Sequence, residues 1–240
     1  MKTNIIFILI SITSLIACKK ETTNQPTTST ETIETSRLED LNIQMNSFSE
    51  IDSSGILMFP LNMGENENEE HSRSYKSIPD QSYWNIVFYN SKTNAYHLLT
   101  DQKMIILDYD FKNGNQRGIE TSSATNHIFY EVRNNDFNKD KLINEDDPIT
   151  LFASDKFGRN FRQISPQNTS LNRWEYIPAS NKIIMTVTKD SDKNKAFDEE
   201  DEIATYTIVL NQNEKPKEVF NKAFKDELKQ LFDRDWKKIK

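Results

Sequence analysis

Apolar and polar positions alternate through much of the chain from about residue 54 to residue 220, which is the period-two pattern of half-buried β-strands. Residues 84–100 can be laid over residues 149–165 without a gap, and each stretch reads as an apolar strand, a polar turn and a second alternating strand. Such internal similarity is typical of a repeated supersecondary unit. The pattern therefore predicts a repeat built from strands.

Two polar stretches rich in Asp and Asn, residues 136–147 and 190–201, interrupt the strand pattern at matching places. The strands predicted on either side of them span residues 127–133, 148–152, 182–188 and 202–210. β-branched and aromatic side chains are frequent in these flanks and favour strands over helices. Each polar stretch is therefore expected at the tip of a β-hairpin.

Together these elements predict an all-β domain over residues 37–220, in which a four-stranded antiparallel unit, or blade, recurs about three times. The units lie near residues 54–100, 103–165 and 170–220. Three blades are fewer than the four to eight of a closed propeller, so an incomplete propeller, irregular closure by the N-terminal segment and closure by a dimer all remain open. The alternative is that an Asn- and Lys-rich β-meander resembles itself through composition alone.

The segment 154–166 contains an aspartate, a glycine, an Asn-x-Arg sequence and an apolar-Ser-Pro ending. In these features it resembles the turn and last strand of the propeller repeats in TolB-type periplasmic proteins. The two polar stretches are also similar in placement to the metal loops of integrin-type propeller blades. These resemblances imply a propeller-like arrangement, although the first unit contains no acidic loop with ligand spacing.

The C-terminal segment, residues 221–240, follows the period of a helix instead. Its apolar residues are Phe224, Leu228, Leu231, Phe232, Trp236 and Ile239, with Lys, Asp and Glu on the other faces. This pattern predicts an amphipathic helix that packs on the last sheet and covers an edge or an open end. A partner-binding surface is the alternative.

The two polar stretches place oxygen side chains at loop positions 1, 3, 5, 9 and 12, with a backbone carbonyl at position 7, which is the ligand spacing of an EF-hand-type calcium loop. In the first loop these positions hold Asp136, Asn138, Asp140, Leu142, Asn144 and Asp147, and in the second they hold Asp190, Asp192, Asn194, Ala196, Asp198 and Asp201. A hard cation collects six to eight oxygens in this way. The spacing predicts two Ca²⁺ sites.

Other loop positions set the expected affinity. Lys141 and Lys195 occupy position 6, where glycine normally makes the sharp turn, and a left-handed backbone there costs a residue with a side chain about 1 kcal/mol. We expect dissociation constants of ~10⁻⁴ to 10⁻³ M, with the second loop tighter because it has more carboxylates. Ile143 and Phe197 at position 8 should anchor the loops to the sheet. An Asx-rich turn without an ion is the alternative.

The N-terminus has a basic start, a short apolar run and a small residue before Cys18, which are the features of a secretory leader over residues 1–17. The sequence Leu-Ile-Ala-Cys that ends at Cys18 resembles the bacterial lipobox. The resemblance implies a lipid anchor at Cys18 and, by similarity to Gram-negative lipoproteins, the outer membrane, with periplasmic or surface display left open. Residues 18–36 then form a flexible tether. An ordinary secretory leader with a chance cysteine is the alternative.

A net charge of −7 and a pI near 5.2 argue against a nucleic-acid partner, because a phosphate backbone requires a basic face. The acidic segment 62–81 lacks ligand spacing and is expected to be a solvated loop. No catalytic motif is present in the sequence. These observations predict a calcium-binding envelope lipoprotein that serves as a non-catalytic binding or accessory module for a protein or glycan partner. The alternatives are a hydrolase of extracellular polysaccharide or peptide with a calcium-stabilised scaffold, and a purely structural surface protein.

Overall fold

The computed structural model describes residues 43, 45, 47–63, 82–110, 121–210 and 214–237. The predicted leader, Cys18, the tether, residues 64–81 of the acidic segment and Ile239 lie outside these residues. Of the described residues, 43% are in strands, and the remaining regular structure consists of two helices. The mostly β, antiparallel character of the fold and the C-terminal helix are confirmed, and the sheets are not closed into a ring.

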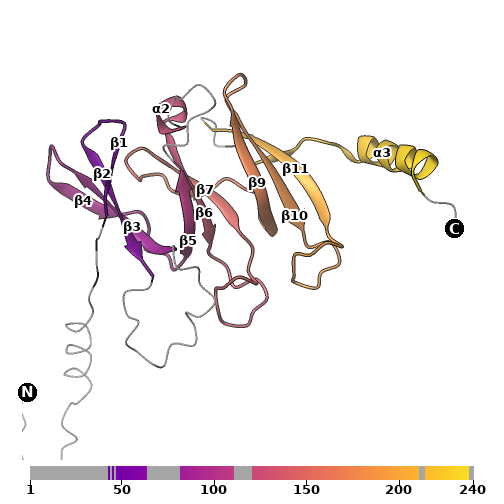
Figure 1. Ribbon diagram of the computed structural model, residues 1–240, viewed down its shortest axis with the longest axis horizontal. Coiled ribbons are helices and arrows are strands. Elements are labelled where there is room, and N and C mark those ends of the chain that lie inside the picture. Colours follow the sequence, from indigo (N-terminus) through magenta and orange to yellow (C-terminus); the bar gives the residue numbers. More distant parts are fainter. Residues whose placement is uncertain are drawn as a thin grey trace, which may run out of the picture. The chain divides into compact units, whose positions relative to one another are not determined.

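The larger sheet contains eight strands in the order β1-β2-β3-β5-β6-β7-β8, and β4 pairs with β3 away from this path (Figure 1). Its strands are β1 Ser49–Ile51, β2 Ile56–Asn62, β3 Tyr83–Asn90, β4 Ala95–Leu98, β5 Ile105–Asp110, β6 His127–Arg133, β7 Thr150–Asp155 and β8 Arg162–Gln163. A short helix, α2 Thr121–Thr125, precedes β6. The first strand begins before residue 54, which was the predicted start of the first unit.

The smaller sheet contains four strands in the order β12-β11-β10-β9. Its strands are β9 Thr169–Ile177, β10 Lys182–Lys189, β11 Glu202–Val209 and β12 Lys217–Glu218. The chain thus passes through three consecutive antiparallel meanders, β1–β4, β5–β8 and β9–β12. The first two meanders are joined in one sheet through a single residue pair, Tyr83 with Ile106, so they are not separate sheets as the sequence had suggested.

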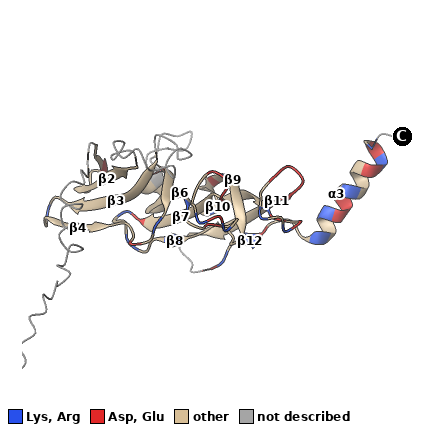
Figure 2. Ribbon diagram, turned by 90° about the horizontal axis from the view of Figure 1, so that it is seen from below, with Lys and Arg blue, Asp and Glu red and all other residues tan. Residues whose placement is uncertain are grey.

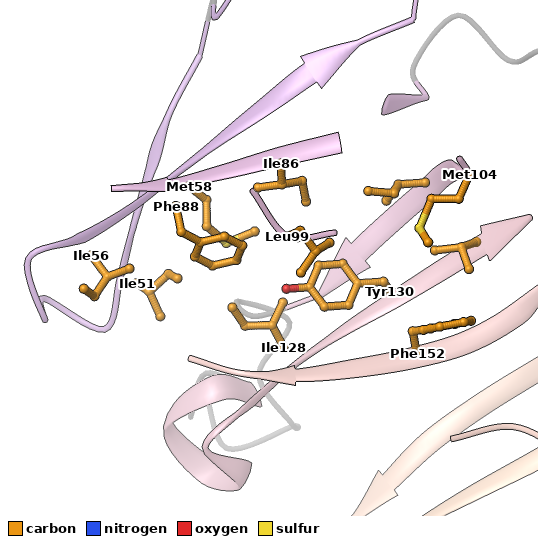
Figure 3. Packing of buried hydrophobic residues seen from close by; sticks show 12 residues of the cluster. Ile51, Ile56, Met58, Ile86, Phe88, Leu99, Met104, Ile128, Tyr130 and Phe152 are labelled. Carbon is orange, nitrogen blue, oxygen red and sulfur yellow. The ribbon is translucent and has the colours of Figure 1, made fainter. Parts of the chain in front are cut away.

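The β6–β7 hairpin is buried on both faces, which explains the consecutive apolar residues 128–130 and 151–153 in its two strands. Ile128, Tyr130 and Val132 of β6 face a hydrophobic cluster shared with β1, β2 and β3 (Figure 3). The intervening Phe129 faces a second cluster, in which residues of β7 meet residues of β9, β10 and β11. The buried Tyr130 hydroxyl pairs with the Ser154 hydroxyl at 2.8 Å, so its polar atom is satisfied in the core.

Trp174 of β9 connects the smaller sheet to this hairpin. Its ring lies 4.8 Å from the ring of Phe129, centroid to centroid, and its Nε1 donates a hydrogen bond of 2.9 Å to Glu131 Oε1. Glu131 is about half-buried, and this burial raises the pKa of its carboxyl group, against the lowering effect of the Trp174 hydrogen bond. The indole therefore provides a polar contact inside an otherwise apolar interface.

The C-terminal helix, α3 Lys222–Asp235, begins at Asn221, whose side chain accepts a 2.9 Å hydrogen bond from Phe224 N. Lys225 forms ion pairs with Glu202 of β11 and Glu218 of β12, and these link the first turn of the helix to the sheet. Charged residues also continue along its length (Figure 2).

The prediction that the apolar stripe of α3 packs on the last sheet is wrong. None of the described residues of α3 is buried, and Phe232 and Trp236 are 63% and 75% exposed. The edge of β11 is covered instead by β12, which pairs with it at two residue pairs. In the described part of the chain, neither helix has the length and apolar character needed to cross a membrane.

Gly158, in the turn between β7 and β8, has a left-handed φ of 72° and lies against the ring of Phe88 of β3. Gly158→Ala should destabilise the protein by roughly 2–5 kcal/mol, because it adds the cost of a left-handed residue to that of overpacking a core ring. Thermal or urea unfolding measures the loss. The control is Gly55→Ala, where φ is 81° but the nearest atoms belong to the flexible side chains of Ser91 and Lys92. Equal losses for the two variants would contradict the packing argument.

Glu131→Gln should stabilise the protein at neutral pH, because the amide oxygen still accepts the Trp174 hydrogen bond and no charge is buried. An acid with a raised native-state pKa contributes stability that is complete below its unfolded value, near 4.5, and is lost as pH rises through the native value. The gain in melting temperature over wild type should therefore be larger at pH 7 than at pH 4. Glu175→Gln, on the exposed face of β9, is the control. A gain that is independent of pH would contradict this account.

Candidate metal centre

The two predicted calcium loops connect antiparallel strands, one between β6 and β7 and the other between β10 and β11 (Figure 1). The segments that flank each loop are therefore strands, as predicted, and not the helices of an ordinary EF-hand. The strand pairs are in register from His127 to Val132 in β6 and, directly up to the start of the second loop, from Lys182 to Lys189 in β10. The β10–β11 pair therefore holds the ends of the second loop at the spacing of neighbouring strands.

The aspartate at position 12 has the same role in both loops. Asp147 Oδ1 accepts a hydrogen bond from Phe137 N at 2.7 Å, and its Oδ2 accepts one from Asn144 N at 3.1 Å. Asp201 accepts hydrogen bonds from the N–H groups at the same two positions, at 2.7 and 3.2 Å. Both aspartates are buried, with 3% and 9% of their surface exposed. One carboxylate thus closes each loop by joining its beginning to its end.

The other ligand positions repeat the same hydrogen-bond pattern. The position-3 oxygen accepts from the position-5 N–H at 2.9 Å in both loops, and the position-5 oxygen accepts from the position-7 N–H at 2.8 and 2.7 Å. The position-9 oxygen accepts from the position-11 N–H at 2.8 and 2.9 Å. These bonds orient the side chains, so two loops of different sequence share one backbone design.

The left-handed turns predicted at position 6 are present. Lys141 has a φ of 75° and Lys195 a φ of 68°, and the lysines at position 4, Lys139 and Lys193, are also left-handed at 68° and 66°. The position-6 N–H groups donate to the position-1 carboxylates, from Lys141 to Asp136 at 2.9 Å and from Lys195 at 3.3 Å in the second loop. This strain is offset by the hydrogen bonds that the turn makes possible.

The second loop gathers three carboxylates. Oxygens of Asp190, Asp192 and Asp201 all lie within 4.8 Å of one another, and among the described residues this is the group of acidic, His or Cys side chains that could hold a metal ion. Asp190 Oδ1 is buried and has no hydrogen-bond partner. A buried carboxylate oxygen without a donor is costly, and a cation would satisfy it. Oxygen-only donors suit a hard cation.

The first loop is arranged differently at its entrance. Asp136 Oδ1 accepts a 3.0 Å hydrogen bond from Asp140 N, and position 3 is the amide Asn138, so three carboxylates do not converge there. Among the predicted ligands, the structure therefore brings together the acids at positions 1, 3 and 12 of the second loop.

A further residue at the first loop is Arg133, the last residue of β6, which the sequence pattern did not identify. Its Nη1 donates to the backbone oxygens of Glu145, at 3.0 Å, and of Asp147, so its guanidinium holds the far end of the first loop. Burial lowers the pKa of this guanidinium, while the neighbouring Asp147 raises it. The equivalent position before the second loop is Val187, so the repeat gave no signal for this arginine.

The two loops also contact each other. The ring of Phe137, at position 2 of the first loop, lies 5.0 Å from the ring of Phe197, at position 8 of the second. Phe197, which is expected to anchor its own loop to the sheet, thus packs on a residue of the neighbouring loop. Between the loops lies a cleft of about 510 Å³, which is lined by residues of both loops together with Arg133 of β6 and Ser170 of β9.

No protein-family model matches this chain, and no curated protein matches it.

Asp201→Ala should destabilise the metal-free protein by about 1–3 kcal/mol, because two loop N–H groups lose a charged acceptor. Thermal unfolding in EDTA measures this effect apart from any effect of a cation. The matched control is Glu199→Ala, which removes the same charge from an exposed position of the same loop that makes no hydrogen bond within the described residues. Equal effects of the two substitutions would show that Asp201 does not hold the loop closed.

Proposed function

We propose that this protein is a calcium-binding lipoprotein of the bacterial cell envelope, and that its β-meanders form a non-catalytic binding or accessory module for a protein or glycan partner. The observation that carries the proposal is the hydrogen-bond pattern shared by the two loops, together with the convergence of Asp190, Asp192 and Asp201. Two loops with one design and an oxygen-only donor set support a common hard cation.

Calcium fits these loops better than a smaller or softer ion. The candidate ligands are carboxylate, amide and backbone oxygens, without thiolate or imidazole, and such donors favour Ca²⁺ or Mg²⁺ over transition metals. A loop of twelve residues with side-chain ligands at alternate positions provides many oxygens, which Ca²⁺ accepts in a flexible geometry, whereas Mg²⁺ requires a near-ideal octahedron. Asp190, Asp192, Asn194, Asp198, Asp201 and the Ala196 carbonyl would hold the ion in the second loop, and Asp136, Asn138, Asp140, Asn144, Asp147 and the Leu142 carbonyl in the first.

The three meanders support a blade-like repeat. Each consists of four consecutive antiparallel strands, and the second and third meanders carry their metal loop at the same place, between their second and third strands. The equivalent connection of the first meander, between β2 and β3, includes residues 64–81, which lie outside the described residues. We place the module in an open, propeller-like array. Its connection to the membrane rests on the lipobox-like sequence at Cys18.

A structural ion and a lipid anchor together favour a binding or accessory module. The carboxyl group with a raised pKa among the described residues, Glu131, is engaged by Trp174 in the contact between the sheets, and it is not among the residues that line the cleft. The hydrolase alternative requires carboxyl groups that converge on a substrate cleft away from the metal loops. The observed arrangement therefore supports recognition better than hydrolysis.

Calcium titration of the EDTA-stripped protein tests the proposal. Millimolar Ca²⁺ should release or absorb heat in a calorimeter and raise the melting temperature, with about 1.4 kcal/mol of stabilisation per site at ten times the dissociation constant. Asp190→Asn should remove the tighter site and Asp136→Asn the weaker one, since each replaces one carboxylate by its isosteric amide. Mg²⁺ at the same concentration is the control ion. Absence of both heat and thermal stabilisation would overturn the proposal.

A further inference from the structure

The cleft between the two metal loops has the dimensions of a ligand site. Its volume of about 510 Å³ lies in the range of small-molecule pockets. Its walls come from two different meanders, and the contact between Phe137 and Phe197 holds these walls together. Neither loop alone forms this space, so a ligand in it would contact both candidate metal sites.

Arg133 lines this cleft, and two of its nitrogens are not engaged by the protein. Both bonds from its Nη1 go to backbone oxygens of the first loop, and these fix the plane of the guanidinium. Its Nε and Nη2 have no hydrogen-bond partner among the described residues, and neither atom is fully buried. The Nε–Nη2 edge of an arginine matches the two oxygens of a carboxylate. The fixed guanidinium is therefore a preorganised receptor for such a group.

Because of the other charged residues in the cleft, its affinity for an anionic ligand should depend on whether the loops hold metal ions. Lys195 adds a second cation from the other loop, whereas Glu145, Asp146 and Asp147 add carboxylates. Asp147 is already committed to two N–H groups of its own loop. A divalent ion in each loop would offset the carboxylate charge near the cleft, so an anionic ligand would meet a more positive field when the loops are loaded.

The neutral lining suits a sugar ring. Ser170 Oγ accepts a 3.3 Å hydrogen bond from Ile149 N, which leaves its hydroxyl hydrogen for a ligand oxygen. Ile149, Ala196 and Phe197 provide apolar surface beside it. A ring with hydroxyl groups, an apolar face and one carboxylate would use each of these features.

We propose that the cleft binds a carboxylate-bearing sugar, namely a uronic acid unit of a glycan, and that Arg133 receives the carboxylate through its Nε and Nη2. This inference rests on the proposed function, because the binding of the anion follows the loading of the loops with calcium. It assigns the glycan partner to a defined site and gives the two metal loops a common task.

Calorimetric titration of the full-length protein in detergent tests the inference, with digalacturonate as the probe and its methyl ester as the uncharged match. In calcium, wild type should bind digalacturonate at least roughly tenfold more tightly than the ester, because the ester cannot form the charge-assisted pair. Arg133→Gln should lose about the same factor, and Arg133→Lys should lose part of it, because lysine keeps the charge but not the fork. Arg173→Gln, on β9 outside the cleft lining, should bind as wild type does.

The outcomes separate this inference from the proposed function. Calcium heat without digalacturonate binding overturns the inference and leaves the calcium proposal standing, whereas absence of calcium heat overturns the proposal itself. Equal binding of acid and ester, or undiminished binding by Arg133→Gln, would also overturn the inference, as would equal binding in calcium and in EDTA. Preferential binding of a triglutamate peptide would assign the cleft to acidic peptides and exclude a sugar as its ligand. Calcium titration and melting of each variant show whether its metal loops are intact.

Discussion

Burial of the β6–β7 hairpin on both faces is the constraint on which the candidate site depends. Tyr130 and its neighbours in alternation face one hydrophobic cluster, and Phe129 faces the other. A strand that contributes to two cores cannot shift its register by one residue without exchanging every side chain between them. The first candidate metal loop and Arg133 are therefore held at the end of a strand pair whose register is fixed by two cores.

In both loops, hydrogen bonds within the loop hold the oxygen side chains in place. Their position-12 aspartates each join the two ends of a loop, and smaller Asx-type bonds orient the intermediate oxygens. Most of these oxygens are satisfied by backbone N–H groups, whereas Asp190 Oδ1 is buried without a donor. The second loop therefore holds the larger excess of negative charge, and a divalent cation is the natural partner for it. The repulsion between the clustered carboxylates of the second loop, and the burial of Asp190 Oδ1, are unfavourable, and a bound cation would relieve both.

Contact between the two loops places the candidate metal ligands beside the cleft that we propose as a ligand site. Phe137 and Phe197 connect two meanders at their tips, and the cleft beside them brings together a fixed guanidinium, a lysine and candidate metal ligands. Ion binding would change the charge of the cleft as well as the stability of the hairpins.

Much of this organisation was readable from the sequence. Period-two alternation placed the strands, and the spacing of Asp and Asn identified both loops and their left-handed turn at position 6, because these features depend on residues close together in the chain. Helical periodicity likewise located α3. It did not reveal that its apolar stripe is exposed, because a stripe records which residues share a face and not what covers that face.

Tertiary structure decided the features that depend on residues distant in sequence. Arg133 gave no local signal, and its function in the site follows from the position of β6 beside the far end of the first loop. Phe197 was predicted to serve its own loop, but the packing of the third meander beside the second brings it to Phe137. The sequence by itself determined strands, turns and candidate ligands through local periodicity and spacing. Only the packing of the meanders determined which residues of the two loops meet and where a cleft forms, because these depend on contacts whose partners no short window of sequence contains.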